Sequence, residues 1–141
     1  MDERIQELIE NICDDLEIDV PTVSNDTSMF PTDTTMAMAD GMNYTIHIKK
    51  QNISPDYVFS IIHELRHLWQ WKTDKRAYFD NYKNSDACSL EEYNLQIAEL
   101  DANAYAAWIM IEEFGIKPLW EGQSDKVIDG INKRMVEIAI E

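Results

Sequence analysis

Residues 54–71 read SPDYVFSIIHELRHLWQW, and this stretch predicts the central helix of the fold. Ser54 is a good N-cap residue, Pro55 suits the first helical position, and Asp56 complements the helix dipole. Apolar residues then recur at helical spacing, which places one face of the helix in a core. These apolar residues are Val58, Ile61, Ile62, Leu65, Leu68 and Trp69.

The same helix carries an H-E-x-x-H run from His63 to His67. Two histidines four residues apart project from one helical face, so both imidazoles can reach a single Zn²⁺ ion. Glu64 lies between them, close enough to act as a general base on a water bound to that ion. The plain alternative is a pair of histidines on a polar face that bind nothing. The helix and the polar stripe favour a metal site.

A catalytic zinc ion normally has three protein ligands, so one more must come from elsewhere. Residues 89–108 predict one long helix, with Ser89 as N-cap and Glu92 completing a capping box. We predict Glu99 as the third ligand, because it shares a polar stripe of this helix with glutamine and asparagine. Asp101 lies nearly opposite Glu99 on the helix and cannot bind the same ion. The alternative for Glu99 is an ordinary solvated helix glutamate.

The H-E-x-x-H run, followed on the next long helix by E-x-x-A-N-x-aromatic-A at residues 99–106, resembles the ImmA/IrrE family of metallopeptidases. The resemblance covers roughly residues 44–112. It implies a small zincin-like α+β domain and peptidase activity, directed in some members at a regulatory protein of a phage or mobile element. Arg66 stands where the family usually has glycine.

The predicted fold is therefore α+β, with a short antiparallel sheet packed against the H-E-x-x-H helix and a second ligand-bearing helix. The predicted reaction is zinc-dependent peptide hydrolysis, in which His63, His67 and Glu99 hold Zn²⁺ and Glu64 moves the proton. A donor should also stabilise the oxyanion. Tyr105, His47 and Tyr93 are the candidates for this role, and the sequence does not choose among them.

The rest of the chain is expected to complete one domain over residues 1–141. Residues 3–13 predict an amphipathic helix, and residues 16–20 a short strand that stops at Pro21. Residues 35–39 and 44–49 flank a turn and predict a hairpin. Residues 73–87 show no clean period and are expected to form a loop or a short helix. The second ligand helix should end at Gly115, and a last helix should pack through residues 127–138.

Composition narrows the classes of function. The formal net charge of −15 over 141 residues argues against binding nucleic-acid phosphates or anionic membranes. A protein or peptide substrate remains open, as does a non-catalytic acidic binding protein or inhibitor on a zincin scaffold. The first residues do not read as a signal peptide, and no segment is long and apolar enough to span a bilayer. Cys13 and Cys88 read as free thiols, so a cytoplasmic protein is expected.

Overall fold

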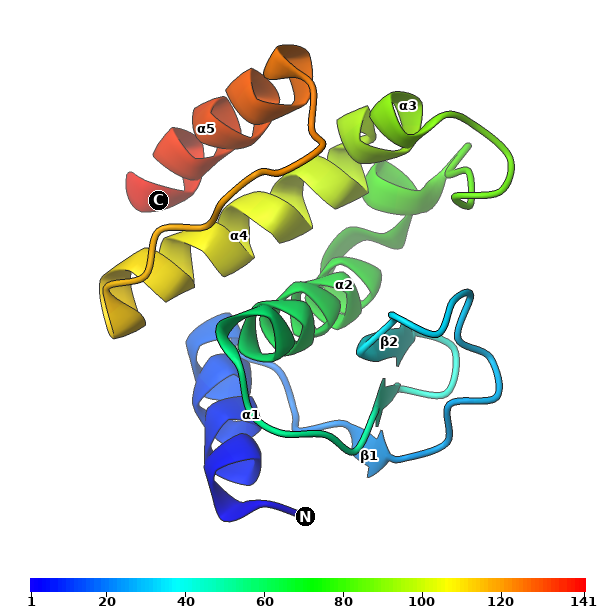
Figure 1. The fold of residues 1–141 in the computed structure, drawn as a ribbon, viewed down its shortest axis with the longest axis vertical. Coiled ribbons are helices and arrows are strands. Elements are labelled where there is room, and N and C mark those ends of the chain that lie inside the picture. The colour runs from blue at the N-terminus through cyan, green and yellow to red at the C-terminus, as the bar shows by residue number, and fades with distance from the viewer. The chain divides into compact units, whose positions relative to one another are not determined.

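The computed structural model describes residues 1–141, which fold as an α+β chain of five helices and three short strands (Figure 1). The chain divides into two compact units, residues 1–73 and 74–141. No helix combines the length and apolarity that a bilayer crossing requires.

The first unit opens with helix α1, Glu3–Leu16. Its N-cap is Asp2, whose carboxylate accepts a hydrogen bond from the backbone N–H of Arg4. The predicted amphipathic helix is confirmed and runs three residues further than expected. Its buried stripe continues through Cys13 and Leu16.

The predicted strand at residues 16–20 is wrong. Leu16 is the last residue of α1, and Glu17 ends the helix with φ of 57°. Leu16 belongs to the helical stripe, because it lies four residues after the buried Ile12, whereas Val20 is exposed. The first strand, β1, comes only after Pro21 and spans Thr22–Ser24.

The predicted hairpin is confirmed with shorter strands. Strands β2 (Ala37–Asp40) and β3 (Thr45–Ile48) pair antiparallel, with Asp40 opposite Thr45. Strand β1 pairs parallel to the other edge of β3, so the sheet order is β1-β3-β2. Ile46 and Ile48 are buried on one face of β3, and His47 points to the other.

Helix α2, Pro55–Phe79, follows the sheet and is interrupted at Asp74, which has non-helical backbone angles. The Ser54 hydroxyl accepts a hydrogen bond from the backbone N–H of Tyr57, as its predicted capping role requires. Ile61, Ile62, Leu65 and Leu68 are fully buried, which confirms the predicted core face.

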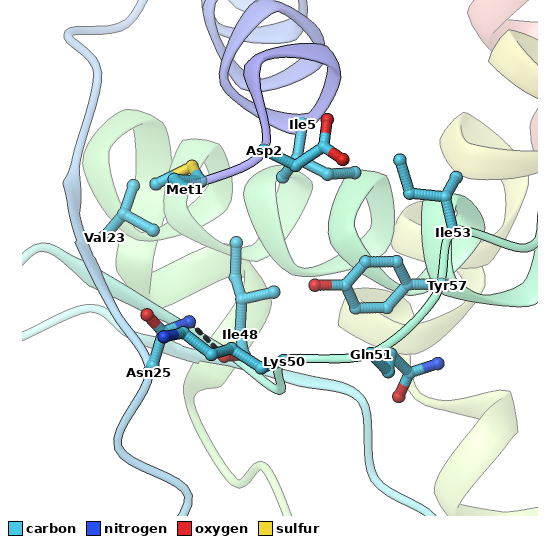
Figure 2. Close-up of a pocket in the computed structure, with 10 residues that line it drawn as sticks. All are labelled: Met1, Asp2, Ile5, Val23, Asn25, Ile48, Lys50, Gln51, Ile53 and Tyr57. Atoms are coloured by element: carbon cyan, nitrogen blue, oxygen red, sulfur yellow. Dashed lines mark hydrogen bonds between the residues drawn. The ribbon is translucent and has the colours of Figure 1, made fainter.

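A hollow of about 300 Å³ lies in the first unit between the start of α1, the sheet and the start of α2 (Figure 2). Its lining is largely apolar, with Ile5, Val23 and Ile48 among the residues that face it. On one side of the hollow, the side-chain amide of Asn25 donates a hydrogen bond to the backbone carbonyl of Ile48. None of the predicted site residues lines this hollow.

In the second unit, residues 89–108 do not form one helix, which corrects the sequence expectation. Helix α3 (Leu90–Leu95) is separated from α4 (Ile97–Phe114) by Gln96, whose ψ of 144° is extended. The Gln96 side-chain amide accepts from the backbone N–H of Lys83 at 2.7 Å and donates to its carbonyl at 3.0 Å. This tertiary pairing stabilises the break. Ser89 is the N-cap of α3, as predicted, and its hydroxyl accepts from the backbone N–H of Glu92 and donates to the Glu92 carboxylate.

Helix α4 ends at Gly115, which adopts the left-handed conformation as predicted. The chain then returns along α4, and helix α5, Asp125–Ala139, packs against α4 (Figure 1). The core of this unit contains Ala104, Val127 and Ile131. The predicted last helix is therefore confirmed.

The two cysteines are free, and burial raises the pKa of the Cys13 thiol to about 11.

The turn between β2 and β3 depends on a close approach by an aromatic ring. A Cβ atom at Gly41 would lie 2.3 Å from Cδ2 of Trp71, far inside contact distance. Any larger residue must therefore displace the indole ring of Trp71, which belongs to α2.

We expect Gly41→Ala to lower the free energy of unfolding by about 1–3 kcal/mol, the usual cost of overpacking. Urea unfolding would measure the change. Met42→Ala is the matched control, because the neighbouring Met42 side chain is 82% exposed. Equal stability of the two variants would show that Trp71 moves away at no cost.

Candidate metal centre

Helix α2 brings the two predicted histidine ligands together. The Nε2 atoms of His63 and His67 lie 3.1 Å apart, and the rings meet nearly at right angles, at 87°. Two nitrogen ligands bound to one tetrahedral zinc ion would lie about 3.3 Å apart, given Zn–N bonds of 2.0–2.1 Å. The separation of these two nitrogens fits a single ion of this kind.

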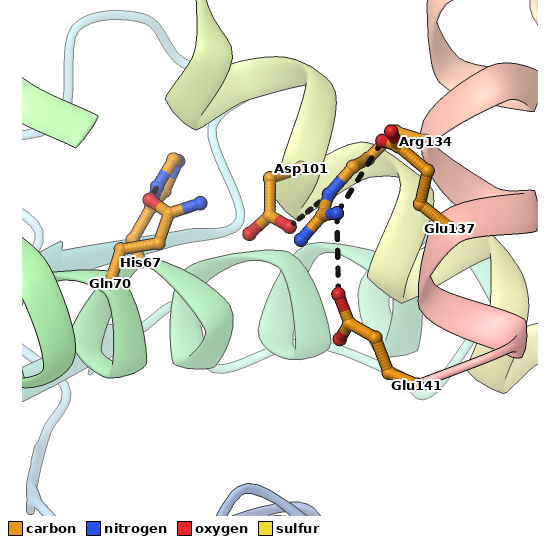
Figure 3. A network of polar contacts seen from close by, with 6 residues as sticks. All are labelled: His67, Gln70, Asp101, Arg134, Glu137 and Glu141. Atoms are coloured by element: carbon orange, nitrogen blue, oxygen red, sulfur yellow. Dashed lines mark hydrogen bonds and ion pairs between the residues drawn. The ribbon is translucent and has the colours of Figure 1, made fainter. Parts of the chain in front are cut away.

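Gln70 orients the second histidine. Its Oε1 atom lies 2.8 Å from Nδ1 of His67, and the glutamine is fully buried (Figure 3). A carbonyl oxygen only accepts hydrogen bonds, so Nδ1 of His67 carries the hydrogen. The lone pair is then on Nε2, the nitrogen that faces His63. A ligand histidine is commonly held in this way by an acceptor behind it.

We expect Gln70→Leu to weaken the binding of a divalent metal ion by about 10- to 100-fold, because His67 loses the acceptor that fixes its tautomer. Competition with a chromophoric chelator would measure the dissociation constant. Gln70→Glu keeps an acceptor at this position and should retain tighter binding than Gln70→Leu. Unchanged affinity in Gln70→Leu would mean that the tautomer is fixed in another way.

Glu64 is held beside the histidines by the neighbouring strand. Its Oε1 atom accepts a hydrogen bond of 3.0 Å from the backbone N–H of Ala39 in β2. Its other oxygen, Oε2, lies 3.5 Å from Nε2 of His63. The sheet therefore orients the carboxylate toward the nitrogen where a metal ion and its water would bind.

Arg66, the residue that replaces the usual glycine, folds back along its own helix. Its guanidinium lies 3.7 Å from the centre of the Trp69 ring, and the side chain is 4% exposed. Trp69 also lines a hollow of about 460 Å³ with Tyr44 and Lys72.

In the second unit, Glu99 lies in the first turn of α4 and is 2% exposed. It is therefore not a solvated helix glutamate. Its Oε2 atom accepts a hydrogen bond of 2.7 Å from the hydroxyl of Tyr82. The Tyr82 oxygen in turn lies 3.0 Å from the hydroxyl oxygen of Tyr93.

The sequence reasoning missed Tyr82, which follows α2 in a segment with no periodic pattern. Burial and the nearby charge of Glu99 raise the pKa of Tyr82 far above its ordinary value. The hydroxyl therefore keeps its proton at neutral pH and can donate to a carboxylate. Only the contact itself identifies this residue, because no motif marks it.

Asp101 serves a different partner from Glu99. Its Oδ1 atom accepts a hydrogen bond of 2.8 Å from Nε of Arg134 on α5, and the aspartate is 1% exposed (Figure 3). Arg134 also lies 3.5 Å from carboxylate oxygens of Glu137 and Glu141. This ion pair joins α4 to α5.

The three predicted oxyanion donors lie in different settings. Tyr93 is on α3 and reaches Glu99 through Tyr82. Tyr105 is buried on α4, and His47 is on the sheet face opposite Ile46 and Ile48. The choice among them stays a prediction.

The comparison with protein families agrees with these local arrangements. The model of peptidase family M78, described as the IrrE N-terminal-like domain, matches residues 13–134. The match includes both histidines, Glu64, Tyr82 and Glu99. It confirms the resemblance inferred from the sequence and indicates a metallopeptidase type of function. No curated protein and no solved structure gave a match.

Proposed function

We propose that this chain, which belongs to the IrrE N-terminal-like family of peptidases, is a zinc-dependent metallopeptidase. Its proposed reaction is the hydrolysis of peptide bonds in a protein substrate. The observation that carries the proposal is the convergence of the His63 and His67 Nε2 atoms, 3.1 Å apart, beside a carboxylate held by the sheet. A purely structural zinc site has no need of a base between its histidines.

The proposed ligands are His63, His67 and Glu99, which offer two imidazole nitrogens and one carboxylate oxygen. This donor set is typical of catalytic zinc sites, which keep a position open for water or substrate. When bound, zinc acidifies water and polarises the scissile carbonyl. Glu64 takes the proton of the attacking water and later delivers it to the leaving amine.

The free edge of β2 is the proposed docking site for an extended substrate. Ala39 belongs to this edge strand, and its N–H meets the Glu64 carboxylate. A peptide that pairs with such an edge gains backbone hydrogen bonds, so its scissile bond would lie beside the general base.

The strongly acidic chain favours a basic substrate by long-range attraction. A regulatory protein of a phage or mobile element is the proposed type of substrate, and the cytoplasm the proposed location.

We expect Glu64→Gln to lower peptidase activity by at least about 100-fold while zinc stays bound, because the amide cannot accept the water proton. Peptide cleavage and elemental analysis of the same preparation would measure both quantities. His63→Ala is the control, and it should lose the zinc as well as the activity. Equal turnover by Glu64→Gln would remove Glu64 as the base.

A wild-type protein that holds no zinc, even after zinc is added back, would contradict the proposal. An acidic binding protein or inhibitor on a zincin scaffold would then become the leading function, since its partner binding would not require metal.

We expect Glu99→Ala to weaken zinc binding much more than Asp101→Ala. Asp101→Ala should instead lower the free energy of unfolding by about 1–3 kcal/mol, because it removes a charged hydrogen bond to the Arg134 guanidinium. Chelator competition and urea unfolding of the two variants would separate these effects. The reverse order of zinc affinities would exclude Glu99 as the ligand.

A further inference from the structure

We propose that Tyr82 is a positioning residue for the Glu99 carboxylate, and that Tyr93 and Gln96 hold Tyr82 in place. This inference rests on the proposed function, in which Glu99 is a metal ligand. It assigns a task to a buried tyrosine outside the H-E-x-x-H helix and explains why the long helix breaks before Glu99.

Only one assignment of the hydroxyl protons satisfies both the contact of Tyr82 with Glu99 and the contact of Tyr82 with Tyr93. An ionised carboxylate only accepts hydrogen bonds, so the single hydroxyl proton of Tyr82 is given to Oε2 of Glu99, 2.7 Å away. Tyr82 then has no second proton for Tyr93. The Tyr93 hydroxyl must therefore donate to the Tyr82 oxygen across their 3.0 Å contact. Donation runs in one direction, from Tyr93 to Tyr82 to Glu99.

This direction has a consequence for the carboxylate. Oε2 of Glu99 is engaged by a short hydrogen bond, so Tyr82 fixes the position of this oxygen. A buried carboxylate with one oxygen held in this way favours binding through a single oxygen. The ligand is then oriented before a metal ion arrives, so less ordering is needed on binding.

Tyr82 is held from two sides. The Gln96 amide pairs with both backbone groups of Lys83, the next residue, which anchors the turn that carries Tyr82. The Tyr82 ring also meets the rings of Phe79 and Tyr93 edge-on, with centroids 5.3 and 6.1 Å away. The helix break at Gln96 thus supplies the amide that positions the tyrosine.

The test uses zinc and cobalt alone, with no substrate. We expect Tyr82→Phe to weaken zinc binding by about 10- to 100-fold and to alter the visible absorption spectrum of the Co²⁺-loaded protein, because the carboxylate is freed to change its binding mode. Tyr93→Phe acts one hydrogen bond further away and should have the same effects at smaller size. Chelator competition and absorption spectroscopy would measure them.

Tyr57→Phe is the matched control. It also removes a partly buried hydroxyl, which donates to the Lys49 carbonyl at 2.7 Å, and it should leave the metal affinity and the cobalt spectrum unchanged. If Tyr82→Phe does not fold, Gln96→Ala tests the same arrangement, because it releases Lys83 while keeping both tyrosines. It should also weaken zinc binding.

The outcomes separate this inference from the proposed function. If the wild type binds zinc and His63→Ala does not, but both Tyr82→Phe and Gln96→Ala keep wild-type affinity and spectrum, the positioning role is wrong and the metal site stands. Unchanged metal binding with slower turnover in Tyr82→Phe would also overturn it and make Tyr82 a transition-state donor. A wild type without zinc would contradict the proposed function itself.

Discussion

The helical spacing of two histidines on α2 is the constraint on which the rest of the site depends. A helix turns so that residues four apart lie one above the other, which allows both Nε2 atoms to meet at 3.1 Å. On the apolar side of the same helix, Ile61, Leu65 and Leu68 are fully buried. The core therefore fixes the rotation of α2, and that rotation determines where the histidines point. Gln70 and Ala39 refine this placement, one behind His67 and the other against Glu64.

The two buried carboxylates of α4 differ in the partner that each one contacts. Glu99 and Asp101 are two residues apart and almost fully buried. Asp101 receives a guanidinium from α5, which neutralises its charge within the second unit. Glu99 instead receives a neutral hydroxyl, so its negative charge is not cancelled by that partner. Tyr82 therefore holds Glu99 without placing a positive charge beside it.

Short sequence patterns predicted those elements whose structure depends on residues close together in the chain. The H-E-x-x-H helix, its Ser54 cap, the hairpin and the Gly115 helix end all follow from short-range spacing, and each is confirmed. The break at Gln96 was not predictable in this way, because it depends on Lys83, thirteen residues earlier. Tyr82 has no periodic context, and the parallel pairing of β1 with β3 needs a long-range partner. The error at Leu16 arose because a run of five residues fits a strand and a helix end equally well.

The separation of α3 from α4 also affects how this chain tolerates changes in length. The direction of the Glu99 side chain is set by α4, which begins only two residues before it, at Ile97. A residue inserted into α3, or into the loop before it, would lengthen that segment without turning Glu99 about the α4 axis. In one continuous helix the same insertion would rotate every later residue by about 100° relative to the earlier ones. The break at Gln96 therefore separates the direction of the Glu99 side chain from the length of the loop before α3.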